Sequence, residues 1–200
     1  MRLWHWSTFI IIVLSFYSVF VGKFFLNPFN TAGTIHDSLQ HLGFQNNPDP
    51  SFPIAQALSK NIWDWHTRYG YVLTALFLFR IIIEGFQKGN QSFMQRIKSG
   101  FFLFRKNDYR KTAGHYLIVR FIYLLFYITL ALVTGTGLWL AFHRHSSNME
   151  LAHSIKQIHE SCFYFLFLFI IIHISGVIRA ERKGYKNIVS NMINGGNEGE

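Results

Sequence analysis

The chain has 200 residues, of which half are hydrophobic, 18% are aromatic and only 14% are charged. Its net charge at pH 7 is +9, and its single cysteine, Cys162, excludes an internal disulfide framework and a cysteine-rich zinc or iron–sulfur site. The hydrophobic residues form long blocks separated by short polar stretches, which is typical of membrane-spanning helices and excludes an ordinary soluble domain.

Four of these blocks are long enough to cross a bilayer, because about 18 or more mainly apolar residues span its hydrocarbon core as a helix. We therefore predict an all-α integral membrane protein, a four-helix transmembrane bundle within a single domain of residues 1–195. Residues 196–200 are rich in Gly, Asn and Glu and are predicted to form a disordered tail. The predicted spans are approximately residues 4–26, 66–86, 117–142 and 155–180.

The connections between the spans predict their orientation. Residues 27–65 contain all four prolines and form a long outer segment, which we expect to shape a periplasmic docking surface. Residues 88–120 hold eight Lys and Arg, and residues 179–186 hold four more. Since basic connections stay in the cytoplasm, both termini and the connection between the second and third spans are predicted to be cytoplasmic. The positive charge therefore indicates topology and contact with anionic lipid, not binding to nucleic acid.

The ten histidines fall into groups by position. Five lie in the outer connections or at their edges and are interpreted as solvated polar residues: His36, His41, His143, His145 and His153. Four lie within or at the end of a predicted span, where ionisable side chains are scarce and tend to mark function. These four are His5, His66, His159 and His173.

The spacing of the last two histidines predicts a haem protein. His159 and His173 are 14 residues apart, which is about 21 Å along a helix and about 40° short of four full turns. Both imidazoles therefore project from nearly one helix face, one toward each surface of the membrane. Neutral imidazole is a good axial ligand of haem iron, so this helix could hold two stacked haems. The chain has no Cys-x-x-Cys-His, so c-type attachment is excluded.

Topology supplies the second ligand of each haem. His66 begins the second span outside, at the depth of His159, and His5 begins the first span inside, at the depth of His173. The predicted axial pairs are thus His66 with His159 for the outer haem and His5 with His173 for the inner one. The alternatives are that these histidines make interhelical hydrogen bonds, or line a metal-transport path, which would favour more carboxylates than the spans contain.

Two further residues of the second span have competing interpretations. Gly70 follows His66 by four residues and could let a macrocycle approach the helix backbone, although small residues also mediate helix packing. Arg80 lies 14 residues after His66, near the inner haem, and could bind a propionate. Its alternative partner is Glu84, at the i,i+4 helical spacing.

These residues resemble the cytochrome b subunit of membrane-bound nickel–iron hydrogenases, a group within the prokaryotic cytochrome b561 class that is related to formate dehydrogenase gamma subunits. The similarity covers nearly the whole chain. The spacing of His159 and His173 and the terminal segment at residues 190–195 are its most specific parts. It is also carried by Arg2-Leu-Trp-His5-Trp, His66-x-x-x-Gly70 with Arg80, Gly114-His115 and Thr134-Gly135.

The resemblance implies two haem b groups with the four histidines as ligands, in a multi-pass protein of the bacterial inner membrane. It also implies that electrons pass from a periplasmic hydrogenase, which has a large subunit and a small iron–sulfur subunit, to a quinone near the cytoplasmic face. The small subunit would deliver the electrons, and His115 would lie at the quinone site. The chain departs from the family in three places. Tyr116-Leu117 replaces the usual Asn-Pro, the first outer segment is unusually long, and the customary cytoplasmic extension before the first motif is missing.

Three functions remain open at this stage. The first is an electron-transfer subunit of a hydrogen:quinone oxidoreductase complex, which is not itself a complete enzyme, and for which homodimerisation is also open. The second keeps the haems in a stand-alone quinone oxidoreductase or in the anchor of another dehydrogenase. The third is a haem-free membrane anchor.

Overall fold

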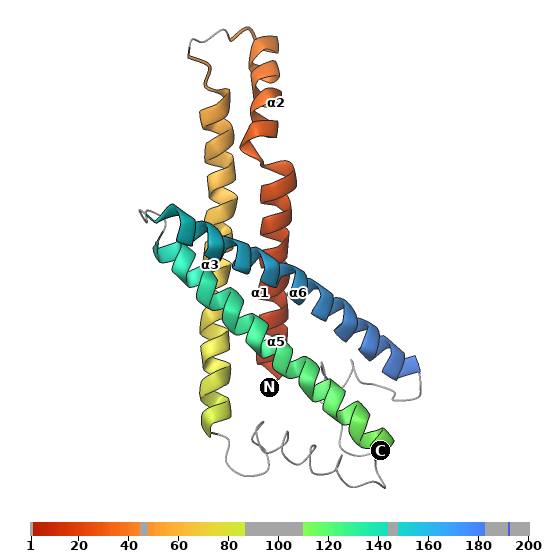
Figure 1. Ribbon diagram of the computed structural model, residues 1–200. Helices are drawn as coiled ribbons and strands as arrows, with labels where there is room; N and C mark the ends of the chain where they lie inside the picture. Colours follow the sequence, from red (N-terminus) through yellow and green to blue (C-terminus); the bar gives the residue numbers. More distant parts are fainter. Residues whose placement is uncertain (1, 45–47, 87–109, 144–147, 183–191, 193–200) are drawn as a thin grey trace. The chain divides into compact units, whose positions relative to one another are not determined.

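Helices make up all of the regular structure in the described part of the chain. The computed structural model describes residues 2–44, 48–86, 110–143, 148–182 and 192, with the backbone alone for residues 110–120. The elements are α1 (Arg2–Phe20), the π-helix η1 (Val21–Phe25), α2 (Pro28–His41), α3 (Ser51–Phe86), α5 (Arg110–Phe142) and α6 (Met149–Arg182), as Figure 1 shows. Contacts divide them into two units, His5–Leu76 and Met1–Trp4 with Phe77–Glu200, which we describe in turn.

Four helical segments are long and apolar enough to cross a membrane. They are Arg2–Phe25, Ser51–Phe86, Phe121–Phe142 and Met149–Arg182. Large apolar side chains such as Ile82, Leu132 and Ile172 remain exposed along them, as is expected of surfaces that face lipid rather than water. The predicted all-α class with four spanning helices is therefore confirmed. The proposed tail, residues 196–200, lies outside the described residues.

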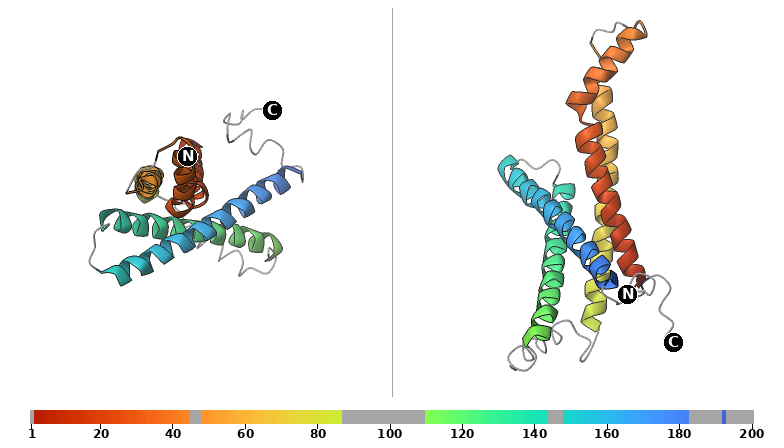
Figure 2. Two further views of the ribbon diagram at one scale, coloured as in Figure 1. Left: turned by 90° about the horizontal axis from the view of Figure 1, so that it is seen from above. Right: turned by 90° about the vertical axis from the view of Figure 1, so that its right-hand side faces the viewer.

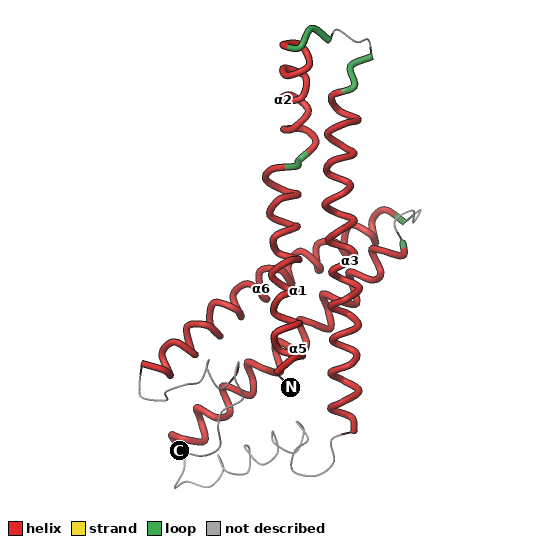
Figure 3. The backbone as a smooth tube through the Cα atoms, turned by 180° about the vertical axis from the view of Figure 1, so that it is seen from behind, coloured by secondary structure: helices red, strands yellow, loops and turns green. Residues whose placement is uncertain are grey.

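In the unit His5–Leu76, α1 and α3 lie side by side in opposite directions (Figures 1 and 3). Gly22 in η1 permits their close approach. A Cβ at this position would lie only 3.2 Å from Cε2 and Cζ2 of Trp63 and 3.3 Å from Cγ2 of Ile62. Ser18, one turn earlier, is only 1% exposed. A small residue at the contact thus lets the backbone approach an indole, as small residues do between membrane helices.

The segment between the first two spans is largely helical, and its prolines mark where helices begin. Pro28 occupies the first turn of α2, after Asn27, whose side chain accepts a hydrogen bond from the Phe29 amide at 3.1 Å. Pro53 lies in the first turn of α3. Helix α2 ends in a Schellman motif, in which Gly43 adopts a φ of 80°. The amides of Gly43 and Phe44 donate to the carbonyls of Gln40 and Leu39.

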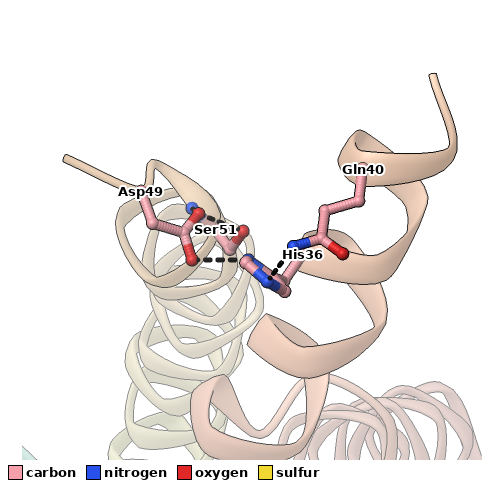
Figure 4. Close-up of polar contacts among 4 residues, drawn as sticks. All are labelled: His36, Gln40, Asp49 and Ser51. Atoms are coloured by element: carbon pink, nitrogen blue, oxygen red, sulfur yellow. Dashed lines mark hydrogen bonds and ion pairs between the residues drawn. The ribbon is translucent and has the colours of Figure 1, made fainter. Parts of the chain in front are cut away.

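A polar cluster joins α2 to the start of α3 (Figure 4). The Asp49 carboxylate accepts hydrogen bonds from the amide and hydroxyl of Ser51, at 2.9 and 2.6 Å, and lies 2.8 Å from Nδ1 of His36. The Ser51 hydrogen bonds, followed by the His36 contact, lower the pKa of Asp49 below its usual value. Gln40 contacts the other ring nitrogen of His36 at 2.9 Å. Helix α3 thereby begins at Ser51, 15 residues before the predicted span, and its 36 residues extend about 54 Å.

In the other unit, α5 and α6 pack against each other (Figure 2). The rings of Phe126 and Phe169 stack with their centroids 4.5 Å apart, and the fully buried Leu130 lies one turn further along α5. At the start of α6, the Asn148 side chain accepts from the Leu151 amide at 3.1 Å. Arg179 and Arg182 occupy its last turn, where positive charge favours the helix dipole.

Candidate functional site

The four histidines of the predicted spans are all partly buried. His5 lies in α1, His66 in α3, and His159 and His173 in α6. Among the predicted solvated histidines, His41, His143 and His153 are exposed, and His145 lies outside the described residues. No three His, Cys, Asp or Glu side chains of the described ranges gather as ligands of a bare metal ion. A haem iron takes only two axial protein ligands.

His66 is held by the neighbouring helix of its own unit. Its Nδ1 lies 3.0 Å from Oγ of Ser18 in α1. The Trp63 indole, one turn earlier in α3, meets the imidazole edge-on at a centroid distance of 5.7 Å. These two contacts restrict the rotation of the ring about its side-chain bonds, so that Nε2 is the nitrogen that can serve as a ligand.

His159 has a closely similar environment in the other unit. Its Nδ1 lies 3.1 Å from Oγ1 of Thr136 in α5. A Cβ on Gly137 would stand only 3.0 Å from the Cε1 atom of His159, so the imidazole lies against the α5 backbone at a glycine. Here too the Nδ1 edge faces a hydroxyl, and the Val133 carbonyl of α5 is a further hydrogen-bond partner of the imidazole.

In each unit the two histidines lie a similar distance apart along the helices. Since Ser18 contacts His66, His66 lies beside a point in α1 that is 13 residues, or about 20 Å, from His5. In α6 the 14 residues between His159 and His173 correspond to about 21 Å. Each predicted axial pair takes one histidine from each unit. The pairing itself stays a prediction.

The other two histidines have aromatic neighbours on their own helices. The Trp6 ring meets His5 edge-on at 5.7 Å, and Phe169 stacks on His173 at 5.8 Å with an interplanar angle of 9°. Thr8 follows His5 by three residues and therefore shares its helix face. Its hydroxyl is buried without a hydrogen-bond partner within the described part of the chain. A buried hydroxyl in this state fits a site for a polar or charged group carried by a cofactor.

Arg80 is the centre of a second cluster, at the level of His173. Its Nε donates to the Tyr127 hydroxyl at 3.1 Å, its Nη2 pairs with Glu84 at 3.0 Å, and its guanidinium lies 5.6 Å from the Trp4 ring centroid. Tyr127 adjoins Phe126, which stacks on Phe169, one turn from His173. The ion pair with Glu84 is the alternative that the sequence offered for Arg80. Binding of a propionate by Arg80 stays a prediction.

Two predicted positions have fewer described contacts. His115 lies in α5, but its side chain is outside those that the structure describes. A Cβ on Gly70 would meet no described atom within 4 Å, and the same holds for Gly135 and Gly176. Packing against another described side chain therefore accounts for Gly22 and Gly137 but not for these three.

The fold and these residues define a class. Four helices are long and apolar enough to span a membrane, and the four candidate histidine ligands are partly buried. Two of these imidazoles contact a hydroxyl through Nδ1. These features are typical of a multi-pass membrane cytochrome of the b type. The chain belongs to the prokaryotic cytochrome b561 family, whose model matches residues 1–195. Membership implies binding of haem b and a role in electron transfer. Searches of curated proteins and of solved structures found no match.

Sequence reasoning missed the two hydroxyl partners, Ser18 and Thr136. Ser and Thr in a spanning helix ordinarily bond a carbonyl of the preceding turn, as Thr129 and Thr134 do here. Nothing in the sequence separates a hydroxyl that also faces an imidazole from one that does not. Only the register between neighbouring helices identifies them.

Proposed function

We propose that the chain is the di-haem cytochrome b subunit that passes electrons from a periplasmic hydrogenase iron–sulfur subunit across the bacterial inner membrane to the quinone pool. The observation that carries this proposal is the similar spacing of the two histidines in each unit, about 20 Å along the helices. Similar spacings would let two helical units contribute one imidazole each to two haems at two depths. A single haem would need only one histidine from each unit.

The chain's residues bind, orient and enclose the cofactor. His66 with His159, and His5 with His173, are the proposed axial ligands, and Arg80 or the Thr8 hydroxyl is suited to receive a haem propionate. Apolar spans exclude water around these groups, which influences the reduction potential. When bound, haem b supplies one-electron redox chemistry that the side chains lack.

Charge and helix length support the proposed orientation and partners. Lys and Arg concentrate at residues 88–120 and 179–186, which favours a cytoplasmic location for both and contact with anionic lipid there. Helix α2 and the first turns of α3 would then face the periplasm. Helix α3 is about 54 Å long and exceeds the hydrocarbon core by roughly 20 Å. This projecting helical segment is where we propose that the hydrogenase small subunit, with its large subunit, docks.

A second candidate is the cytochrome b anchor of another dehydrogenase, or a stand-alone quinone oxidoreductase. The same projecting segment favours a protein partner over a stand-alone enzyme. Co-purification distinguishes these cases. A tagged chain expressed in its own cells should bring down a nickel- and iron-containing partner, and a partner without nickel would favour another dehydrogenase.

The central test is the number of haems per polypeptide. The purified chain, expressed with ample haem, should bind two equivalents with reduced b-type absorbance, and an optical redox titration should resolve two components. A colourless chain or a single equivalent contradicts the proposal. His66→Ala and His159→Ala should each remove the same component, whereas His5→Ala and His173→Ala should remove the other. His153→Ala, which changes an exposed histidine of α6, is the matched control.

The quinone site has its own test. We propose that His115, at the cytoplasmic end, assists proton uptake during quinone reduction. His115→Ala should retain both haems but reduce a quinone analogue more slowly than the unmodified chain. Unchanged turnover at all quinone concentrations would remove His115 from the site.

A further inference from the structure

We infer that Ser18 and Thr136 are positioning residues whose hydroxyls, each contacting Nδ1 of a histidine from the neighbouring helix, fix His66 and His159 as Nε2 ligands of one haem. The inference rests on the proposed function, because it concerns the ligands of the haem that His66 and His159 share. It adds two residues that act through the imidazoles without touching iron.

The hydrogen count at Ser18 assigns the His66 tautomer. A hydroxyl has one hydrogen, and a carbonyl oxygen has none. Ser18 Oγ lies 2.7 Å from the Ser15 carbonyl, so the hydroxyl hydrogen is donated there. Ser18 Oγ and His66 Nδ1 are 3.0 Å apart, and the imidazole must therefore donate the hydrogen of this hydrogen bond. His66 is protonated at Nδ1, and its lone pair is on Nε2.

The same count applies to Thr136 and His159. Thr136 Oγ1 donates to the Leu132 carbonyl of its own helix. The contact of 3.1 Å between Thr136 Oγ1 and His159 Nδ1 is therefore a hydrogen bond from the imidazole to the hydroxyl. With its proton on Nδ1, His159 likewise carries its lone pair on Nε2.

Two arrangements of the same kind, in separate units, are the reason to assign them a role. Each hydroxyl belongs to the helix beside the one that carries the histidine, and each satisfies a carbonyl of its own helix at the same time. Thr134, on α5, donates to the Leu130 carbonyl and is 7% exposed. Ser15, on α1, donates to the Ile11 carbonyl. These two residues show the ordinary carbonyl bond alone and serve as matched controls.

The expected consequence is a change at one haem only. An acceptor on Nδ1–H orients a metal-bound imidazole and raises its basicity, and loss of such a partner typically weakens metal binding 10- to 100-fold. A more basic ligand favours ferric iron. Removal of either hydroxyl should therefore weaken haem binding about 10-fold and raise the midpoint potential of the haem held by His66 and His159. The haem held by His5 and His173 should keep its potential.

The experiment compares Ser18→Ala and Thr136→Val with Ser15→Ala and Thr134→Val in the full haem-loaded chain. Optical redox titration and haem retention on dilution are the two readouts. We expect both test variants to raise the potential of the component that His66→Ala removes. Thr136→Ser, which keeps the hydroxyl, should restore it.

Two outcomes would overturn the inference. In one, the test variants match their controls in both readouts, and in the other, both haems shift equally, as general loosening of the helices would cause. Failure of the proposed function is seen separately, since the unmodified chain would then bind no haem, or only one. If the unmodified chain binds two haems, but the Ser18 and Thr136 variants keep the potential and haem retention of their controls, this inference is refuted and the proposed function is not.

Discussion

The separation of His159 from His173 depends on one continuous helix, whereas that of His66 from His5 depends on the packing of two. In α6, fourteen residues of regular helix set a separation of about 21 Å whatever the neighbouring helices do. In the unit His5–Leu76, the separation exists only because Ser18 and Gly22 of one helix meet His66 and Trp63 of the other. A shift by one turn between α1 and α3 would change it by about 5 Å.

This contrast indicates where the proposed haem site is vulnerable. Substitutions that disturb interhelical packing should act on the histidine separation of the unit His5–Leu76. In the other unit they should move a single imidazole without changing the separation along α6. Substitutions at Gly137 and Gly22 test this difference and should have the largest effects, and two smaller effects concern polar contacts, one in each unit.

The largest effect should come from Gly137→Val, which acts directly on a proposed ligand. Its Cβ would stand 3.0 Å from Cε1 of His159, too close without displacing the imidazole. We expect loss of about half of the b-type absorbance per polypeptide, with His173 unaffected. Gly85→Val is the control, because a Cβ at Gly85 meets no described atom within 4 Å. Full haem content in the Gly137 variant would show that His159 tolerates displacement.

The next effect concerns packing between α1 and α3. Gly22→Val would press a branched side chain against the Trp63 indole, 3.2 Å from the new Cβ. Overpacking of this kind typically costs about 1–3 kcal/mol of unfolding free energy. Equilibrium unfolding in detergent should show this loss relative to Gly33→Val, where a Cβ meets nothing described within 4 Å. Equal stabilities would mean that close approach at Gly22 is not needed.

A smaller effect is expected at the partly buried ion pair of Arg80 and Glu84, whose side chains are 17% and 28% exposed. A double-mutant cycle with Arg80→Met and Glu84→Gln should give a coupling energy of about 1 kcal/mol in the same unfolding assay. If Arg80 also binds a propionate, Arg80→Met should in addition shift the potential of the His5/His173 haem, and Glu84→Gln should not. A coupling energy near zero would show that the pair is incidental.

The smallest effect should appear with pH at the junction of α2 and α3. The Ser51 hydrogen bonds lower the pKa of Asp49 in the folded chain below its ordinary value of 3.8. The carboxylate therefore contributes stability that is fully present above about pH 4 and is lost as pH falls through the lowered pKa. Hydrogen exchange of the first α3 amides should accelerate in that acidic range. Asp49→Asn should remove this pH dependence. If the Asn variant retains it, another group is responsible.

The sequence by itself determined the class, the four spans and the separation within α6. Each apolar block is long enough to cross the bilayer and is expected to do so as a helix. Lipid offers no hydrogen-bond partners, and a helix satisfies its backbone N–H and C=O groups within the segment. The positions of His159 and His173 on nearly one face follow from helix periodicity alone.

Only the tertiary structure decided what touches these histidines. In the sequence, Ser18 and Thr136 do not differ from other hydroxyl residues of apolar helices. The packing of α1 against α3 brings Ser18 to His66, and the packing of α5 against α6 brings Thr136 to His159. The segment after the first span read as a proline-rich connection, yet Pro28 and Pro53 begin helices because a first turn needs no amide hydrogen. Local periodicity fixes which residues share a face, whereas contacts between helices depend on side-chain packing that no single segment encodes.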